Sequence, residues 1–287
     1  MEGVNSKIFD EERALYGKKD IKVFDCKFDG PRDGESALKE TSNIIVEKCY
    51  FNLRYPIWHV NNIKISDSEY TENCRAAFWY DDNISIDNCK LYGIKALRES
   101  KNIKINKCDI KSLEFAWKCK ELNISDVKIE SEYPFLESKN INIQNMNMKA
   151  KYSFQYVENM KIVNSKLDTK DAFWHSKNVE VVDSEINGEY LGWYSENLKL
   201  IRCKIIVTQP LCYCKGLVLE DCTMEKADLS FERSEVRASI RGKIDSIKNP
   251  KGGSINVSEI GELILEKEYI DSLAKYVENG GQDVQCH

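Results

Sequence analysis

The sequence lacks the features that mark membrane proteins, secreted proteins and nucleic-acid-binding proteins. No apolar run approaches the length needed to cross a membrane. The segment Met1–Lys7 does not place a basic stretch before an apolar one, so we expect no secretory signal and a cytoplasmic location. The 42 Lys and Arg residues stand against 47 Asp and Glu, and none of the basic residues form a cluster. With a net charge of -5, neither nucleic acid nor an anionic membrane is an expected partner.

A complete metal motif is also missing. Cys212 and Cys214 resemble half of a zinc site, but no second half with zinc spacing follows, so we expect no metal and no other cofactor. The 11 cysteines are odd in number, and most of them recur at one place in a repeat. We therefore expect stacked, buried thiols in a reducing compartment rather than disulfides.

The sequence does contain a repeat of 19 residues, which begins with Asn followed by an aliphatic residue. The regular series is Asn83-Ile84, Asn102-Ile103, Glu121-Leu122, Asn140-Ile141, Asn159-Met160, Asn178-Val179, Asn197-Leu198 and Gly216-Leu217, and weaker copies extend it in both directions. When each repeat is numbered from its Asn as position 1, positions 2, 4 and 9 are apolar, and position 7 is mostly Cys or Ser. This alternation predicts short strands with one face buried. Asn at position 1 suits a corner, because Asn tolerates a left-handed backbone.

A third apolar run before each new Asn gives three strands and three corners per repeat. A fixed period of this kind is typical of a solenoid. We predict an all-β, single-stranded, right-handed parallel β-helix of roughly 11–13 rungs, since the hexapeptide repeats of left-handed helices are absent. The prediction is one domain over residues 1–287, with an N-terminal cap (1–19), rungs (20–265) and a C-terminal helix and tail (266–287). Short helices are expected at Phe9–Leu15 and Glu266–Val277.

A leucine-rich repeat is the alternative architecture, because Ile84–Leu91 fits the core of its consensus. Three observations count against it. The period is shorter than the usual 20–29 residues. The position three residues before the first aliphatic is Asp81 or Ser100 where Leu is required, and the stretch after position 9 is aromatic and strand-like.

Positions 16 and 17 concentrate the aromatic and titratable residues. All five tryptophans share position 16, which holds Lys39, Trp58, Trp79, Arg98, Trp117, Leu136, Gln155, Trp174, Trp193 and Cys212. Position 17 holds Glu40, His59, Tyr80, Glu99, Lys118, Glu137, Tyr156, His175, Tyr194 and Tyr213. If position 15 points inward, position 16 faces solvent and offers a ladder of indoles suited to sugars or other elongated ligands. The competing interpretation is that positions 14 and 16 point inward and the indoles fill the core.

The candidate catalytic residues are Glu40, His59, Tyr80 and Glu99, which fall on successive rungs about 5 Å apart. A carboxylate beside an imidazole can orient it for acid–base chemistry. Lys39 and Arg98 flank the group and could hold an anion. The candidate ligand-binding residues are Lys39, Trp58, Trp79, Arg98, Trp117, Trp174, His175 and Trp193. The insertion Asp29–Glu40 is a further place where function could reside.

The architecture resembles pectate lyases, polygalacturonases and related carbohydrate-active β-helices, but their clustered aspartates have no counterpart here. Glu12–Tyr16, Gly34–Glu40 and Arg54–His59 resemble an uncharacterised bacterial family, a domain of unknown function associated with a right-handed β-helix. That resemblance implies the fold and no activity. Three hypotheses follow: a β-helix that binds an elongated, carbohydrate-like ligand, a lyase or hydrolase that uses Glu40 and His59, and a structural or protein-interaction solenoid. A homo-oligomer through an edge or face is compatible with each.

Overall fold

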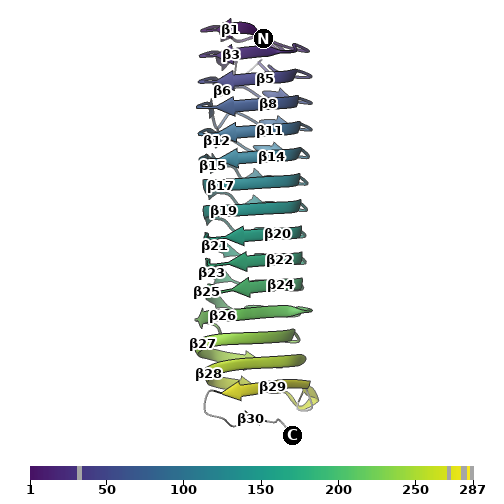
Figure 1. Cartoon of the computed structure of the whole chain (residues 1–287), viewed down its shortest axis with the longest axis vertical. Coiled ribbons are helices and arrows are strands. Elements are labelled where there is room, and N and C mark those ends of the chain that lie inside the picture. The colour runs from purple at the N-terminus through teal and green to yellow at the C-terminus, as the bar shows by residue number, and fades with distance from the viewer. Residues whose placement is uncertain (31–33, 270–272, 279–282, 285–287) are drawn as a thin grey trace. The chain divides into compact units, whose positions relative to one another are not determined.

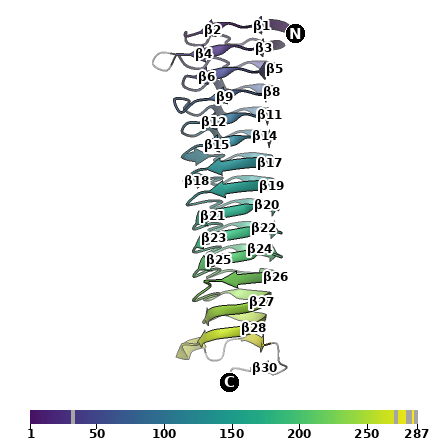
Figure 2. The same cartoon turned by 90° about the vertical axis from the view of Figure 1, so that its left-hand side faces the viewer.

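The computed structural model describes residues 1–30, 34–269, 273–278 and 283–284. The chain forms two compact units, Met1–Asn147 and Met148–His287. Each unit is a parallel β-solenoid in which successive turns lie side by side (Figure 1, Figure 2). The units together contribute about 14 turns about 19 residues apart, so the solenoid prediction is confirmed and the leucine-rich repeat is rejected. The single-domain assignment stays a prediction.

In the first unit, each turn contributes up to three strands. The first strands of the turns are β1 (Glu2–Asn5), β3 (Ile21–Phe24), β5 (Ser42–Glu47), β8 (Asn61–Ser66), β11 (Asp82–Asp87), β14 (Lys101–Asn106) and the longer β17 (Lys120–Glu130), and β19 (Lys139–Lys149) comes next along the chain. The second strands are β2 (Ile8–Phe9), β4 (Lys27–Asp29), β6 (Tyr50–Asn52), β9 (Glu69–Tyr70), β12 (Lys90–Tyr92) and β15 (Asp109–Lys111). The third strands are β7 (Ile57–Trp58), β10 (Phe78–Trp79), β13 (Leu97–Arg98), β16 (Glu114–Phe115) and β18 (Tyr133–Pro134).

The second unit repeats the first and second strands. Its strands are β20 (Glu158–Val163), β21 (Lys166–Lys170), β22 (Lys177–Val182), β23 (Glu185–Glu189), β24 (Glu196–Ile201), β25 (Lys204–Thr208), β26 (Leu217–Glu225), β27 (Glu235–Lys248), β28 (Gly252–Ile264), β29 (Leu273–Glu278) and β30 (Asp283–Val284). A short 3-10 helix, η1, spans Lys267–Tyr269. The pairing between β29 and β30 is antiparallel.

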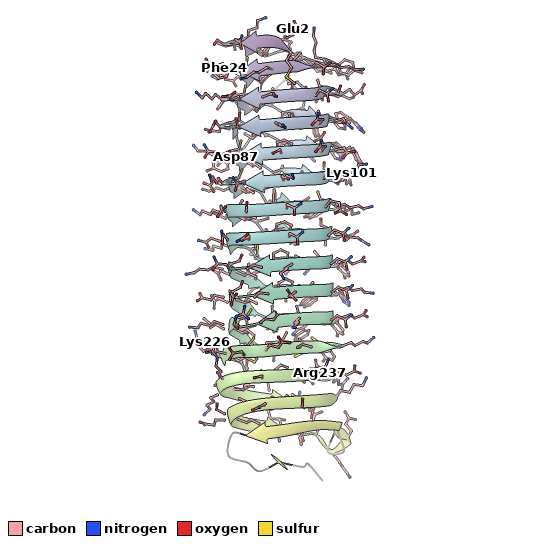
Figure 3. The ribbon with its side chains drawn as sticks, viewed as in Figure 1. Glu2, Phe24, Asp87, Lys101, Lys226 and Arg237 are labelled. Atoms are coloured by element: carbon pink, nitrogen blue, oxygen red, sulfur yellow. The ribbon has the colours of Figure 1, made fainter. Side chains whose placement is uncertain are left out.

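The register of the strands explains the repeat. Ile84 of β11 pairs with Ile103 of β14, which pairs with Leu122 of β17, so position 2 of each turn lies on position 2 of the next. All three side chains are buried, whereas charged side chains such as those of Asp87 and Lys101 lie on the outside (Figure 3). The core is thus a set of inward columns, each buried by its neighbours along the solenoid.

The corners fall where the sequence predicts a left-handed backbone. Asn83 at position 1 has φ 60°, and Asn88 at position 6 has φ 50°. The Asn side chains also link turns: Asn62 Nδ2 donates to Asn43 Oδ1 at 2.9 Å, and Asn83 Nδ2 donates to Asn62 Oδ1 at 3.0 Å. Asn therefore stabilises the corner in two ways: it tolerates the left-handed backbone, and its side chain extends a ladder of amide hydrogen bonds.

The predicted helical caps are wrong. Residues 1–19 form a solenoid turn, in which β1 pairs with β3 and β2 pairs with β4, and turns rather than a helix occupy residues 11–17. At the other end, η1 has three residues and β29 then pairs in parallel with β28. Residues 270–272 of the predicted C-terminal helix lie outside the described residues. An open strand edge exposes unpaired N–H and C=O groups, and one more strand satisfies them better than a helix laid across them.

The cysteine column is buried, as the sequence predicts. All ten described cysteines are free thiols, and Cys286 lies outside the described residues. Burial raises the pKa of the Cys49 thiol to about 11, and it has the same effect on Cys74. The thiols act as small apolar groups that pack between turns.

Candidate functional site

Position 16 lies at the surface of each unit. At position 15, Ile57 and Phe78 are fully buried, and at position 17 His59 and Tyr80 are exposed. Trp58 and Trp79 between them are half-buried. Of the two orientations that the sequence left open, the structure has position 15 inward, position 16 outward and position 17 at a corner.

A corner at position 13 explains why position 14 is buried as well. Tyr55, Ala76 and Lys95 have left-handed backbones there, so Ala77 points inward together with Phe78. Because positions 14 and 15 both point inward, the side chain at position 16 lies on the outer face of the third strand. The competing interpretation was therefore correct for position 14 and wrong for position 16.

In the first unit, the position-16 side chains form one stack with a cation at each end. The indoles of Trp58 and Trp79 are nearly parallel, with ring centroids 5.3 Å apart. Lys39 Nζ lies 4.0 Å from the centroid of the Trp58 ring. The Arg98 guanidinium lies 5.4 Å from that of Trp79. Because the cations and the second indole cover the ring faces, solvent reaches mainly the ring edges.

The position-17 side chains form a second column beside the first. The His59 imidazole stacks on the Tyr80 ring with centroids 5.2 Å apart. Each ring also contacts the indole that precedes it in the chain, at 5.8 Å for His59 and 5.1 Å for Tyr80. The four rings of His59, Tyr80, Trp58 and Trp79 thus form a two-by-two aromatic cluster.

Glu99 closes this cluster on one side. Its carboxylate accepts hydrogen bonds from Trp79 Nε1 at 2.8 Å and from Arg98 at 3.2 Å, and it also bonds the Tyr80 hydroxyl. Partial burial raises the pKa of Glu99, but these three donors outweigh it and hold the pKa below its ordinary value of 4.5. The hydrogen bond to Glu99 raises the pKa of Tyr80, since the phenol is held as a donor. Glu99 is thus an ionised acceptor that positions its neighbours.

Glu40 closes the cluster on the opposite side. Its carboxylate accepts a hydrogen bond of 2.7 Å from the Tyr16 hydroxyl and lies 3.9 Å from Lys39 Nζ. That hydrogen bond raises the pKa of Tyr16. Sequence analysis missed Tyr16, although counting back from Asp20 places it at position 16. Assigning residues 1–19 to a cap hid this position.

The structure brings the four candidate catalytic residues into one column but does not join Glu40 to His59. Among the described residues, no hydrogen bond links these two side chains. Glu40 and Glu99 are three turns apart, or about 14 Å at the ordinary strand spacing of ~4.8 Å. That exceeds the roughly 5–9.5 Å between the paired carboxyl groups of most glycosidases. A catalytic role for Glu40, His59, Tyr80 and Glu99 stays a prediction.

Trp117 continues the position-16 column of the first unit. Its backbone bridges to Arg98, and its Nε1 donates to the Tyr133 carbonyl at 2.5 Å. At position 17 of the same turn, Lys118 pairs with Glu137 at 3.7 Å. The aromatic cluster therefore gives way here to ordinary surface ion pairs, which contribute little to stability.

The second unit carries a longer aromatic column. The rings of Tyr156, His175, Tyr194 and Tyr213 stack in order, with centroid separations of 5.1, 5.0 and 4.8 Å and interplanar angles of 4°, 6° and 10°. Tyr156 and Tyr194 are 49% and 43% exposed, respectively. This stack of four rings, which we call the tyrosine–histidine ladder, presents its edges and hydroxyl groups to solvent.

Two indoles flank the tyrosine–histidine ladder. Trp174 and Trp193 are parallel, with centroids 5.8 Å apart. Trp174 Nε1 donates to the Tyr190 carbonyl at 3.2 Å, and Trp193 Nε1 donates to the Gln209 carbonyl at 2.8 Å. The indole N–H groups are therefore used inside the protein, whereas the tyrosine hydroxyls remain at the surface.

No group of three or more His, Cys, Asp or Glu side chains suited to a metal ion occurs in the described part of the chain. Cys212 and Cys214 are both buried, and burial raises the pKa of their thiols to about 12 and about 11. Cys214 Sγ donates to the Gly192 carbonyl at 3.1 Å.

Within residues 1–30, 34–269, 273–278 and 283–284, no helix has the length and apolar character of a membrane span.

The fold and these surface columns define a parallel β-solenoid with aromatic ladders on its outside. The chain belongs to the family described as "Protein of unknown function (DUF3737)", whose sequence profile matches residues 2–278. The resemblance to an uncharacterised β-helix family is thereby confirmed. No curated protein matches the sequence.

Solved structures show only distant likeness. A surface adhesin of Streptococcus pneumoniae, PfbA, aligns at 9% identity over 100% of this chain and 80% of its own, with a TM-score of 0.42. The catalytic domain of a GH87 alpha-1,3-glucanase, solved with tetrasaccharides, aligns at 9% identity over 98% of this chain and 64% of its own, with a TM-score of 0.27. At these TM-scores, neither structure supports an argument about function.

Proposed function

We propose that the protein binds an elongated, carbohydrate-like ligand along its aromatic columns. The observation that carries the proposal is the tyrosine–histidine ladder of the second unit, where four stacked rings lie at the surface. The rings pack on one another, but their outer edges leave a contiguous strip of aromatic surface in contact with water. A ligand that covers the row would remove this aromatic surface from water.

The stacking restricts how the ligand can bind. The face of a ring inside the ladder is covered by its neighbours, so a sugar ring cannot stack on His175 or Tyr194 from either side. The tyrosine hydroxyls can donate and accept, and the ladder places them at two spacings: Tyr194 and Tyr213 are on neighbouring turns, about 5 Å apart, and Tyr156 and Tyr194 are two turns or roughly 10 Å apart. A polymer with regularly spaced hydroxyl groups can bond to several turns at once. Oligosaccharides have this chemistry.

The aromatic cluster of the first unit offers a shorter version of the same surface. His59 and Tyr80 are exposed, and Lys39 and Arg98 supply charge beside them. Since each cation has a carboxylate next to it, Glu40 or Glu99, the cluster carries no net charge and suits a neutral or mildly acidic sugar.

The test is an array of immobilised oligosaccharides probed with the labelled protein. Wild type should be retained by at least one class of oligosaccharide of four or more sugars. Tyr194→Ser, in the middle of the ladder, should weaken that binding about tenfold, the loss expected from one to two good hydrogen bonds. Tyr50→Ser is the matched control, because Tyr50 lies on β6 at position 8 and away from both columns.

Circular dichroism should show that both variants keep the wild-type fold. Equal retention of the wild type and Tyr194→Ser would contradict the proposal, as would an array on which no oligosaccharide retains the protein. The second outcome would favour the structural or protein-interaction solenoid.

A further inference from the structure

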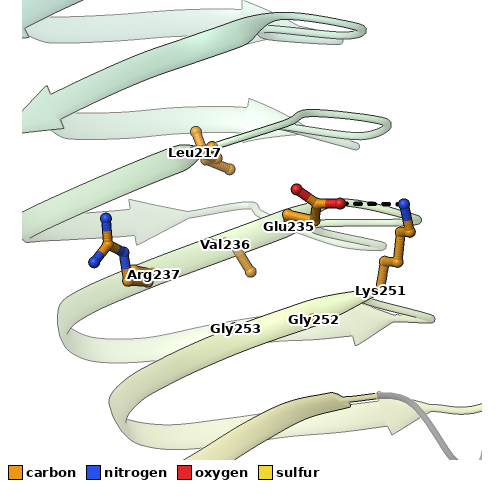
Figure 4. A pocket seen from close by; sticks show the side chains of 8 residues that line it. Leu217, Glu235, Val236, Arg237, Lys251, Gly252 and Gly253 are labelled. Atoms are coloured by element: carbon orange, nitrogen blue, oxygen red, sulfur yellow. Dashed lines mark hydrogen bonds and ion pairs between the residues drawn. The ribbon is translucent and has the colours of Figure 1, made fainter.

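A depression of about 360 Å³ lies in the second unit, on β26, β27 and β28. It is lined by Gly216, Leu217, Glu235, Val236, Arg237, Lys251, Gly252 and Gly253. Figure 4 shows Arg237 at one side and the Glu235–Lys251 pair at the other, with the glycine backbone between them. The volume is within the ~300–1,000 Å³ range of small-molecule sites.

The depression exists because the asparagine ladder stops there. In the preceding turns, Asn178 Nδ2 donates to Asn159 Oδ1 and Asn197 Nδ2 donates to Asn178 Oδ1, each at 3.0 Å. The next residue at position 1 is Gly216, which has no side chain to continue the series. A Cβ placed on Gly216 would lie 2.7 Å from Asn197 Oδ1, so this oxygen is at the rim of the depression.

The rim therefore holds an acceptor with no donor. Among the described residues, none donates a hydrogen bond to Asn197 Oδ1. The two ladder oxygens before it, Asn159 Oδ1 and Asn178 Oδ1, each accept an N–H from the following turn. A ligand that places a hydroxyl or an amide N–H at this point would complete the series.

The opposite side of the depression holds a cation with no counter-ion. Glu235 Oε1 and Lys251 Nζ pair with each other at 3.1 Å. Arg237 has no ion pair or hydrogen bond with any other described side chain, although the next arginine on the same strand, Arg241, pairs with Asp221 at 2.8 Å. A planar guanidinium binds carboxylates through two parallel hydrogen bonds.

The floor of the depression is backbone, because its glycines carry no side chains and the Leu217 and Val236 side chains, 1% and 2% exposed, point into the core. Gly253 passes so close to the preceding turn that an added Cβ would lie 1.8 Å from the Val236 carbonyl oxygen. We infer that this depression binds a small organic carboxylate that carries a hydroxyl or amide N–H. The carboxylate lies against Arg237, the donor against Asn197 and the body of the ligand over the Gly252–Gly253 backbone. These residues are outside the aromatic columns, so the inference does not depend on carbohydrate binding.

The probe for the test is N-acetyl-L-leucine, which has a carboxylate, an amide N–H and an apolar side chain, and its methyl ester is the uncharged comparison. Protein labelled with [15N]glycine gives amide signals from the 14 glycines of the chain. The acid should shift the Gly216, Gly252 and Gly253 signals in a saturable way and leave that of Gly93 unchanged. The ester should bind about tenfold more weakly, because the charge-assisted bond is lost.

Two variants test the geometry. Gly216→Asn should continue the ladder, since its φ of 62° is one that Asn adopts at this position in the other turns, and its side chain should fill the depression and abolish the shifts. Glu121→Asn is the matched control: it places Asn at position 1 of a first-unit turn, where Asn140 Nδ2 bonds the existing side chain. Arg237→Gln should weaken binding about tenfold, and Arg241→Gln should not.

Unaltered glycine signals at saturating probe would overturn the inference. Binding that survives Gly216→Asn, or an ester that binds as well as the acid, would also overturn it.

Discussion

Asp81 is a buried carboxyl group that should cost stability as the pH rises. It occupies position 18, is 2% exposed, and accepts a hydrogen bond of 2.7 Å from the Val60 N–H through Oδ1. No described group bonds to its Oδ2. Burial raises the pKa of Asp81 well above 3.8, more than its backbone hydrogen bonds lower it. The folded protein therefore binds this proton more tightly than the unfolded chain does.

Because the folded protein has the higher pKa at Asp81, its free energy of unfolding falls as the pH rises. Below pH 3.8 the carboxyl is protonated in both states and no cost arises. Above it, the unfolded chain releases the proton and the folded protein keeps it, so stability falls by up to about 1.4 kcal/mol per pH unit until the folded pKa is passed. At pH 5, 1.2 units above 3.8, the cost is about 1.6 kcal/mol.

The replacement that removes this cost is Asp81→Ser. In the next turn, Ser100 Oγ accepts the Asp81 N–H at 3.0 Å and donates to the Arg98 carbonyl at 2.9 Å. A serine at 81 can make the same two bonds, with the Val60 N–H and the Trp79 carbonyl. The smaller side chain leaves a gap that costs up to about 1 kcal/mol.

The assay is urea unfolding of wild type and Asp81→Ser at pH 4, 5 and 6. The difference in free energy of unfolding cancels the titration of groups that both proteins share. It should move in favour of the variant by about 1.1 kcal/mol from pH 4 to pH 5 and by up to about 1.4 kcal/mol per pH unit above that. A difference that stays constant across this range would refute the reasoning, because it would mean that Asp81 titrates alike in the folded and unfolded states.

Two further predictions concern particular contacts. Tyr80→Phe removes one hydrogen-bond donor from Glu99, so the lowered pKa of the Glu99 carboxyl should rise toward 4.5 in carbon NMR of labelled glutamate. The stability that ionised Glu99 contributes above pH 4.5, and that is lost as the pH falls, should become smaller. An unchanged pKa of Glu99 would contradict the assignment of Tyr80 as its donor. Gly253→Ala places a Cβ 1.8 Å from the Val236 carbonyl oxygen at a φ of 110°, so it should lower the free energy of unfolding by roughly 2–4 kcal/mol in thermal unfolding. Gly242→Ala, where nothing lies within 4 Å of the added Cβ, should lower it by about 1 kcal/mol. Equal losses in the two variants would contradict the close approach of Gly253 to Val236.

The fold could be predicted from sequence because the solenoid repeats one local pattern. In-register pairing places Ile84 on Ile103 and Asn83 near Asn62, so a column in the sequence is a column in space. The ends were not predictable in this way. Glu266–Val277 has a spacing of apolar residues compatible with a helix, but the open edge of β28 selects a strand, and this long-range pairing overrides local propensity.

The candidate site was predicted in its composition but not in its geometry. Counting placed the five tryptophans in one column, but alternation alone left open whether they face solvent or core, because positions 14 and 15 are both buried. Periodicity does not report how side chains rotate, so it did not predict that Lys39, Trp58 and Trp79 cover one another's faces. It also did not predict the depression at Gly216, which depends on the absence of a side chain.

Tryptophan fluorescence can show whether the aromatic columns lie at the surface. All five indoles share position 16, so the bulk emission reports on that column. The half-buried indoles predict native emission at a wavelength between those of fully buried and denatured tryptophan, with quenching by acrylamide to an intermediate extent. Blue-shifted emission that acrylamide does not quench would place the indoles in the core and rule out an aromatic binding surface at position 16.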